Sequence, residues 1–162
     1  MLLKGLTDED FVNYKKPSMF FAFPRCSFKC EVDAKCHCCQ NSGMASAADI
    51  SVDVDKITDR YLQNSISKAV VCGGLEPFDS ASDLLAFIKA FRGRTTDDIV
   101  IYTGYTEQEC KGNGWLDALS GFENIIVKFG RYIPNQQPHF DSVLGVNLAS
   151  DNQYAKVIGA SI

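Results

Sequence analysis

Four short apolar runs recur along the chain, each flanked by glycine, proline or polar residues. They are SMFFAFP (18–24), KAVVCGG (68–74), DIVIYTG (98–104) and NIIVKFG (124–130). Runs of this length, rich in valine, isoleucine and aromatic residues, predict buried β-strands. Apolar residues recur with helical spacing in three segments between them, 53–65, 80–93 and the glycine-interrupted 106–121. Alternating strands and helices predict parallel β-α-β units, and hence an α/β fold.

The loops that follow the predicted strands carry the most distinctive residues. A cysteine-rich loop follows the first run, CGGLEP follows the second, and TGYT follows the third. Ligands bind at the carboxyl ends of parallel strands, where such loops meet at one edge of the sheet. The order of these segments therefore predicts a single site in which cysteines lie beside glycines.

Composition narrows the class of protein. The chain has 162 residues, of which 46% are hydrophobic, which predicts one globular domain over residues 1–162. The net charge of −4, without a run of Lys or Arg, argues against nucleic acid or a membrane as partner. The amino-terminal segment lacks the features of a secretory signal, and the apolar runs are too short to span a bilayer. We therefore expect a cytoplasmic protein, whose thiols stay reduced.

Five of the seven cysteines lie in the segment FPRCSFKCEVDAKCHCCQNS, residues 23–42. An odd number of cysteines in a reducing compartment disfavours a disulfide framework. Thiolates bind soft metals, and the segment contains one CxxxC pair, Cys26 and Cys30, and one CxxC pair, Cys36 and Cys39. Taken alone, this loop is equally consistent with a structural zinc site and with an iron–sulfur cluster.

The neighbouring motifs resemble those of the radical-SAM superfamily, in particular the activating proteins of anaerobic ribonucleoside-triphosphate reductases. CSFKC and CQN resemble the start and the end (CYN) of that family's CxxxCxxC motif, although eight residues separate Cys30 from Cys39 where two are usual. CGGLEP is similar to the family's GGEP segment, and YTGYT to its third-strand segment. VKFGRYIP and LGVNLASDNQ resemble the family's carboxyl-terminal part, with Ala149 in place of a glycine. The resemblance covers residues 17–155.

The resemblance implies a fold, a cluster and a set of contacts. The fold would be a partial, open parallel β/α barrel of the compact radical-SAM type. A [4Fe–4S] cluster would be bound by Cys26, Cys30 and Cys39, with Cys36 as the rival of Cys30. Cys38 stands where the family usually has an aromatic residue that touches adenine. The residues expected to contact S-adenosylmethionine are Cys38, Gln40, Gly73, Gly74, Glu76, Pro77, Thr103 and Gly104.

The resemblance also implies a reaction. A flavodoxin-like donor would reduce the cluster, and S-adenosylmethionine would be cleaved to a 5′-deoxyadenosyl radical. The radical would take hydrogen from a glycine in the large subunit of an anaerobic ribonucleotide reductase, without an acid or base from this chain. Two alternatives stay open. One is a radical-SAM enzyme that acts on a small molecule, and the other is a non-catalytic iron–sulfur or zinc protein.

Overall fold

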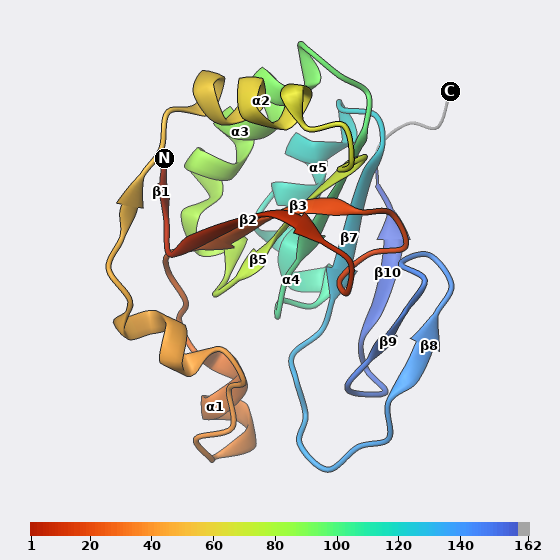
Figure 1. Cartoon of the computed structure of the whole chain (residues 1–162). Helices are drawn as coiled ribbons and strands as arrows, with labels where there is room; N and C mark the ends of the chain where they lie inside the picture. The colour runs from red at the N-terminus through yellow and green to blue at the C-terminus, as the bar shows by residue number, and fades with distance from the viewer. Residues whose placement is uncertain (159–162) are drawn as a thin grey trace.

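The computed structural model describes residues 1–158 and is built around a six-stranded sheet (Figure 1). In spatial order its strands are β10 (Tyr154–Val157), β7 (Ile125–Phe129), β6 (Asp98–Tyr102), β5 (Ala69–Gly74), β3 (Ser18–Phe23) and β2 (Gly5–Asp10). The four inner strands are parallel, and β2 and β10 pair antiparallel at the edges. The protein therefore has a mixed α/β fold with a mostly parallel central sheet.

Each of the four predicted strands forms one inner strand of this sheet. These strands are buried on both faces; in β5, for example, Cys72 faces one core and Val71 faces the other. Burial on both faces explains why the runs are apolar without alternation. The two edge strands were not predicted, because β2 carries three acidic residues and β10 has only four residues. Charged, short strands are typical of sheet edges.

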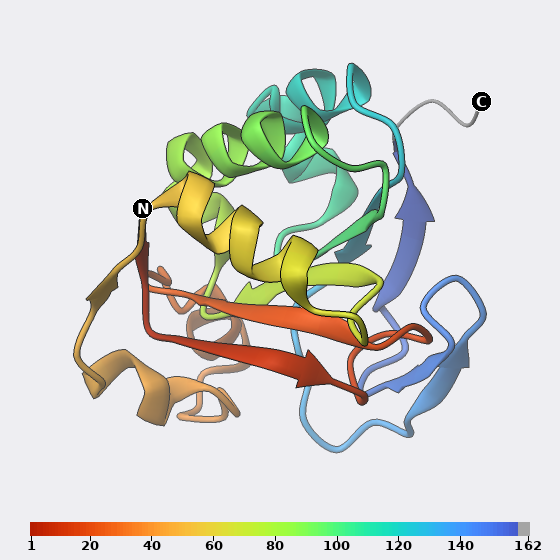
Figure 2. The same cartoon turned by 45° about the horizontal axis from the view of Figure 1, so that its top comes forward.

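Helices cover one face of the sheet (Figure 2). They are α2 (Val54–Gln63), α3 (Ala81–Arg92), α4 (Glu107–Gly112) and α5 (Trp115–Ser120). The helices expected over 53–65 and 80–93 are confirmed, and Asp53 caps the first by accepting a hydrogen bond from the Lys56 N–H. The helix expected over 106–121 is divided into α4 and α5. Gly114, between them, has φ +73°, in the left-handed region that ends a helix.

A two-stranded hairpin packs on the opposite face, formed by β8 (His139–Asp141) and β9 (Val146–Leu148). Leu144 and Leu148 join the core on this side of the sheet. The carboxylate of Asp141 accepts hydrogen bonds at 2.9 Å from the N–H groups of Leu144 and Ala155, the latter in β10. The hairpin is thereby attached to one edge of the sheet.

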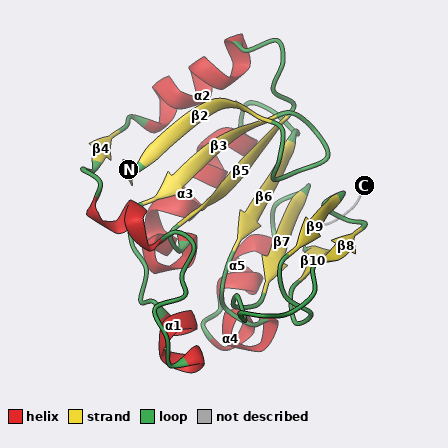
Figure 3. Ribbon diagram, turned by 60° about the horizontal axis from the view of Figure 1, so that its bottom comes forward, coloured by secondary structure: helices red, strands yellow, loops and turns green. Residues whose placement is uncertain are grey.

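A long connection between β3 and α2 contains three short elements and lies beyond the ends of the strands in Figure 3. They are α1 (Lys29–Ala34), the 3-10 helix η1 (Ser42–Ser46) and β4 (Ile50–Ser51), which pairs with β1 (Leu2–Leu3). A second 3-10 helix, η2 (Pro77–Ser80), follows β5. Within residues 1–158, no helix is long and apolar enough to span a membrane.

Candidate functional site

A cavity of about 430 Å³ opens at the carboxyl ends of β3, β5, β6 and β7. Of the residues singled out from the sequence, it is lined by Cys26, Cys30, Cys39, Gln40, Gly73, Gly74, Glu76, Thr103 and Gly104. The prediction that the three loops meet at one edge of the sheet is therefore confirmed. Cys38 and Pro77 lie outside the cavity wall. The individual roles given to these residues stay predictions.

The cysteine loop divides into thiols that line the cavity and thiols that do not. Cys26, Cys30 and Cys39 line it, whereas Cys36 is exposed and Cys38 is half-buried outside it. The neighbouring thiol of Cys39 adds to the effect of burial in raising the pKa of Cys30, and the Cys36 thiol raises the pKa of Cys38 to about 11. Burial raises the pKa of Cys26 to about 12, so this thiol ionises only with strong compensation such as metal coordination.

The spacing of these thiols bears on the kind of metal centre. Among residues 1–158, no three His, Cys, Asp or Glu side chains converge closely enough to bind a single metal ion. In a [4Fe–4S] cluster each cysteine binds a different iron, so the three thiols that line this cavity are compatible with a cluster.

Three hydrogen bonds fasten the cysteine loop to the loop after β5. The N–H of Glu76 donates to the carbonyl of Arg25 at 2.7 Å. The side-chain amide of Asn41 donates to the carbonyl of Gly74 at 2.8 Å. The N–H of Ser27 donates to the Asp79 carboxylate at 2.6 Å. Both ends of the cysteine segment are thus tied to the double-glycine turn, which sets the position of the cavity-lining thiols.

The double glycine is required by the close approach of β5 to β3. Gly74 has φ +82°, and a Cβ built on it would lie 2.7 Å from the Cα of Ala22. A Cβ on Gly73 would lie 3.1 Å from the ring of Phe20. A larger residue at position 74 would therefore clash with backbone in a conformation that L side chains avoid.

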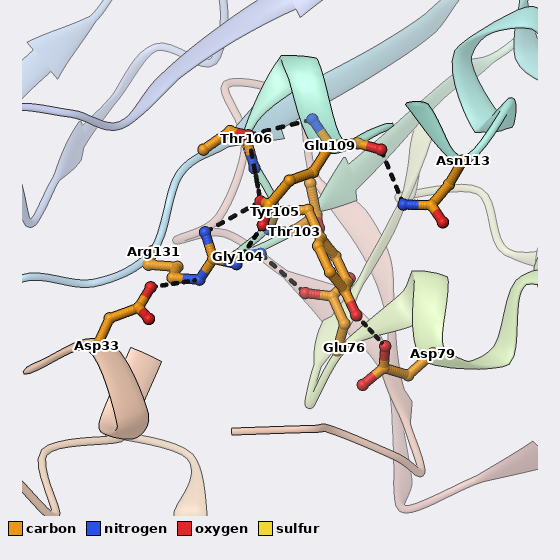
Figure 4. Close-up of polar contacts among 10 residues, drawn as sticks. All are labelled: Asp33, Glu76, Asp79, Thr103, Gly104, Tyr105, Thr106, Glu109, Asn113 and Arg131. Atoms are coloured by element: carbon orange, nitrogen blue, oxygen red, sulfur yellow. Dashed lines mark hydrogen bonds and ion pairs between the residues drawn. The ribbon is translucent and has the colours of Figure 1, made fainter. Parts of the chain in front are cut away.

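Glu76 joins the ends of β5 and β6 (Figure 4). Its side chain is 5% exposed and accepts hydrogen bonds from the Thr103 hydroxyl and the Gly104 N–H, both at 2.8 Å. A third comes from the N–H of Phe78 at 3.1 Å. Burial raises the pKa of this carboxyl to about 7, against the effect of the three donors. The carboxylate thus binds the chain itself and holds Thr103 and Gly104 at the cavity.

Lys128 is a cavity residue that the sequence analysis missed. It lies on β7, is 6% exposed and donates to the carbonyl of Gly130 at 2.8 Å. Within the described residues its other two N–H groups have no hydrogen-bond acceptor. Burial lowers the pKa of its ammonium to about 8. The available signal was a charged residue inside the apolar run IIVKF, a position normally occupied by an apolar side chain.

The segment after β7 closes the site with polar contacts inside the chain. The Arg131 guanidinium donates to both carboxylate oxygens of Glu109, at 2.7 and 3.0 Å, and its Nε lies 3.1 Å from a carboxylate oxygen of Asp33 in α1 (Figure 4). The side-chain amide of Asn152 donates to the Arg131 carbonyl at 2.9 Å. Gln153 donates to the Gly130 carbonyl at 3.3 Å. Arg131, Asn152 and Gln153 lie in the segments VKFGRYIP and LGVNLASDNQ that the sequence analysis singled out, but their partners could not be inferred from the sequence.

The fold and the site together define an α/β domain with a thiol-lined cavity at the carboxyl edge of its parallel strands. A family model described as 4Fe-4S single cluster domain matches residues 18–149, from β3 to the residue after β9. The chain therefore belongs to the family of 4Fe-4S single cluster domains, which indicates an iron–sulfur protein. A search of curated proteins returned no match, and a search of solved structures returned none.

Proposed function

We propose that this protein is a radical-SAM enzyme whose [4Fe–4S] cluster is bound by Cys26, Cys30 and Cys39. The observation that carries the proposal is the meeting of these three thiols with the double-glycine turn around one cavity. The family match supports the cluster. Three cysteine ligands leave one iron of a four-iron cluster free for a further ligand. When bound, the cluster supplies one electron, which cleaves S-adenosylmethionine to methionine and a 5′-deoxyadenosyl radical.

The residues of the chain would bind and orient S-adenosylmethionine. Gly73 and Gly74 line the cavity, so a ligand bound there would meet their backbone at the end of β5. Lys128 provides a buried positive charge with free N–H groups, which suits the carboxylate of the methionine part. Thr103 and Gly104 follow β6, which lies between β5 and β7, and they form a further part of the wall that Glu76 holds in place. Residues of β9, Val146 to Leu148, form a further part of the cavity wall.

We further propose that the radical acts on a protein, namely a glycine of the large subunit of an anaerobic ribonucleotide reductase. The resemblance of YTGYT and the segment around Gly130 and Arg131 to the activating proteins supports this choice. The six-stranded sheet is open, with β2 and β10 at its edges, so the cavity at its strand ends could be covered by a protein substrate. A docked protein would complete the enclosure, and a flavodoxin-like protein would supply the electron.

The test is anaerobic reconstitution of the whole protein with iron and sulfide, followed by reduction with dithionite and addition of S-adenosylmethionine. We expect four irons per chain and formation of 5′-deoxyadenosine. With a reductase large subunit present, we expect a glycyl-radical signal in electron paramagnetic resonance. A protein that binds four irons but forms no 5′-deoxyadenosine under these conditions would contradict the proposal.

A second candidate is an iron–sulfur protein that transfers electrons or binds a partner without cleaving S-adenosylmethionine. The lengthened cysteine loop favours it, because the eight residues between Cys30 and Cys39 include most of α1 and two further thiols. A four-iron cluster that cycles between oxidation states without consuming S-adenosylmethionine would support this candidate. Zinc in a one-to-one ratio and no brown chromophore would instead indicate a zinc protein.

A further inference from the structure

Tyr105 contacts three parts of the site: Asp79 after β5, Lys29 in the cysteine loop, and Arg131 after β7. It is 7% exposed, lines the cavity and follows Thr103 and Gly104 at the end of β6. We propose that Tyr105 is a positioning residue for the iron–sulfur cluster: its hydroxyl fixes the backbone beside Cys26, and its ring holds the ammonium of Lys29 beside Cys30. This inference rests on the proposed cluster ligands, but not on cleavage of S-adenosylmethionine.

The hydroxyl group acts through Asp79. It donates to one carboxylate oxygen of Asp79 at 2.6 Å (Figure 4). The other oxygen accepts a hydrogen bond from the N–H of Ser27 at 2.6 Å. Ser27 directly follows Cys26 in the chain. Two short hydrogen bonds, both accepted by the Asp79 carboxylate, therefore connect Tyr105 to the backbone directly after the first proposed ligand.

The aromatic ring acts on the other end of the CxxxC segment. The Nζ of Lys29 lies 4.5 Å from the ring centroid, well within the range of a cation–π interaction. Lys29 directly precedes Cys30 and also lines the cavity. The guanidinium of Arg131, which pairs with Asp33 in α1, lies 5.9 Å from the same ring centroid. Tyr105 thus contacts two cations that both connect to α1.

These contacts matter because α1 is weakly packed. Every residue of α1 is partly or fully exposed, and the helix has six residues without a side-chain N-cap. Tyr105 itself is rigidly held, since its ring packs edge-on against Trp115 with centroids 5.0 Å apart. Trp115 in turn stacks on Phe78 at 4.6 Å. The fixed side chain of Tyr105 therefore supports the loosely packed segment of α1 that contains Cys30.

The two contacts predict different consequences for a bound cluster. A cation beside a cluster favours its reduced, more negative form, so Lys29 should raise the reduction potential. Removing the tyrosine hydroxyl leaves the charge of the Asp79 carboxylate in place, so its bond to Asp79 should instead affect how firmly Cys26 holds iron. The reduction potential and the rate of iron loss therefore report separately on the ring and on the hydroxyl group.

The experiment uses the whole protein reconstituted anaerobically, with iron and sulfide content, redox titration and iron release to a chelator as readouts. For Tyr105→Phe we expect faster iron release, by about tenfold, at an unchanged potential. For Lys29→Met we expect a more negative potential at an unchanged rate of iron release. In a double-mutant cycle, Tyr105→Leu should abolish the effect of Lys29→Met on the potential, because the ammonium is no longer held.

Two matched controls separate these effects from general destabilisation. Tyr61→Phe removes a hydroxyl bond of the same 2.6 Å length, to Asp97 at the opposite end of the sheet. Lys15→Met removes an exposed lysine whose Nζ lies 5.7 Å from the ring centroid of Tyr14. Neither control should change the potential or the rate of iron release. If Tyr105→Leu does not fold, Tyr105→Phe and Lys29→Met still decide the question.

The possible outcomes distinguish this inference from the proposed function. If Tyr105→Phe and Lys29→Met behave like their controls while all bind four irons, the positioning role is wrong and the radical-SAM proposal is unaffected. If the expected changes occur in a protein that does not cleave S-adenosylmethionine, the positioning role is supported and the proposed function is wrong. A wild-type protein that takes up no four-iron cluster would overturn both.

Discussion

The hydroxyl of Thr103 donates to the carboxylate of Glu76 at 2.8 Å, across the ends of two neighbouring parallel strands. The same carboxylate accepts the N–H of Gly104, so one buried side chain determines the shape of the cavity wall on the β6 side. The sequence motif that contains Glu76 is thus structural as well as a candidate for ligand binding. Because the pKa of the Glu76 carboxyl is raised, its protonation should affect the stability of the protein.

Stability should decrease with pH because of Glu76. Its pKa is raised from 4.5 to about 7 in the folded protein, so between these values the folded state binds more protons than the unfolded state. The free energy of unfolding should therefore fall as pH rises from about 5 to 7, by up to about 3 kcal/mol. Glu76→Gln should remove this slope. Denaturant unfolding of both proteins, without metal, across this pH range provides the measurement, and identical slopes would refute the assignment.

Gly74→Ala should destabilise the protein by at least about 2 kcal/mol, because the new Cβ meets the Ala22 backbone in a left-handed conformation. Gly43→Ala is the matched control, since a Cβ at Gly43 has no atom within 4 Å. Urea midpoints of the two variants give the comparison. Equal midpoints would mean that β5 and β3 do not approach as closely as described.

The cavity-lining thiols should be the cluster ligands. We expect Cys30→Ala to abolish both the four-iron cluster and 5′-deoxyadenosine formation, since Cys30 lines the cavity. Cys36→Ala should keep both within about twofold of wild type, because this exposed thiol lies outside the cavity wall. Iron and sulfide analysis of both variants, together with an assay for 5′-deoxyadenosine, provides the measurement. The reverse pattern would show that Cys36 replaces Cys30 as ligand.

Lys128 should bind the carboxylate of S-adenosylmethionine in its protonated form. Lys128→Met should weaken binding by about ten- to a hundredfold, the usual effect of losing a charge-assisted hydrogen bond. Because the pKa of Lys128 is lowered to about 8, wild-type affinity should decline as pH rises through 8, and the variant should lack this component. Calorimetric titration of the cluster-loaded protein at several pH values measures both. Equal affinities of the two proteins would exclude this role.

Sequence patterns by themselves determined the parallel core and the place of the site. The runs containing Val71, Val100 and Val127 could be recognised as strands because burial on both faces demands continuous apolar residues. Parallel connection then forces the loops with Cys30 and Gly74 to the same edge, whatever the packing details. A short run of apolar residues suffices to predict such a strand, because burial on both faces constrains consecutive residues of the same segment.

The tertiary structure alone decided which side chains reach the cavity and what each contacts. It made Lys128 part of the cavity wall, placed the ring of Tyr105 against the ammonium of Lys29, and paired Arg131 with Glu109 and Asp33. It also separated the thiols that line the cavity from those outside it. These relationships depend on contacts between residues distant in the chain, and their energies depend on burial, which no local pattern of polar and apolar residues encodes.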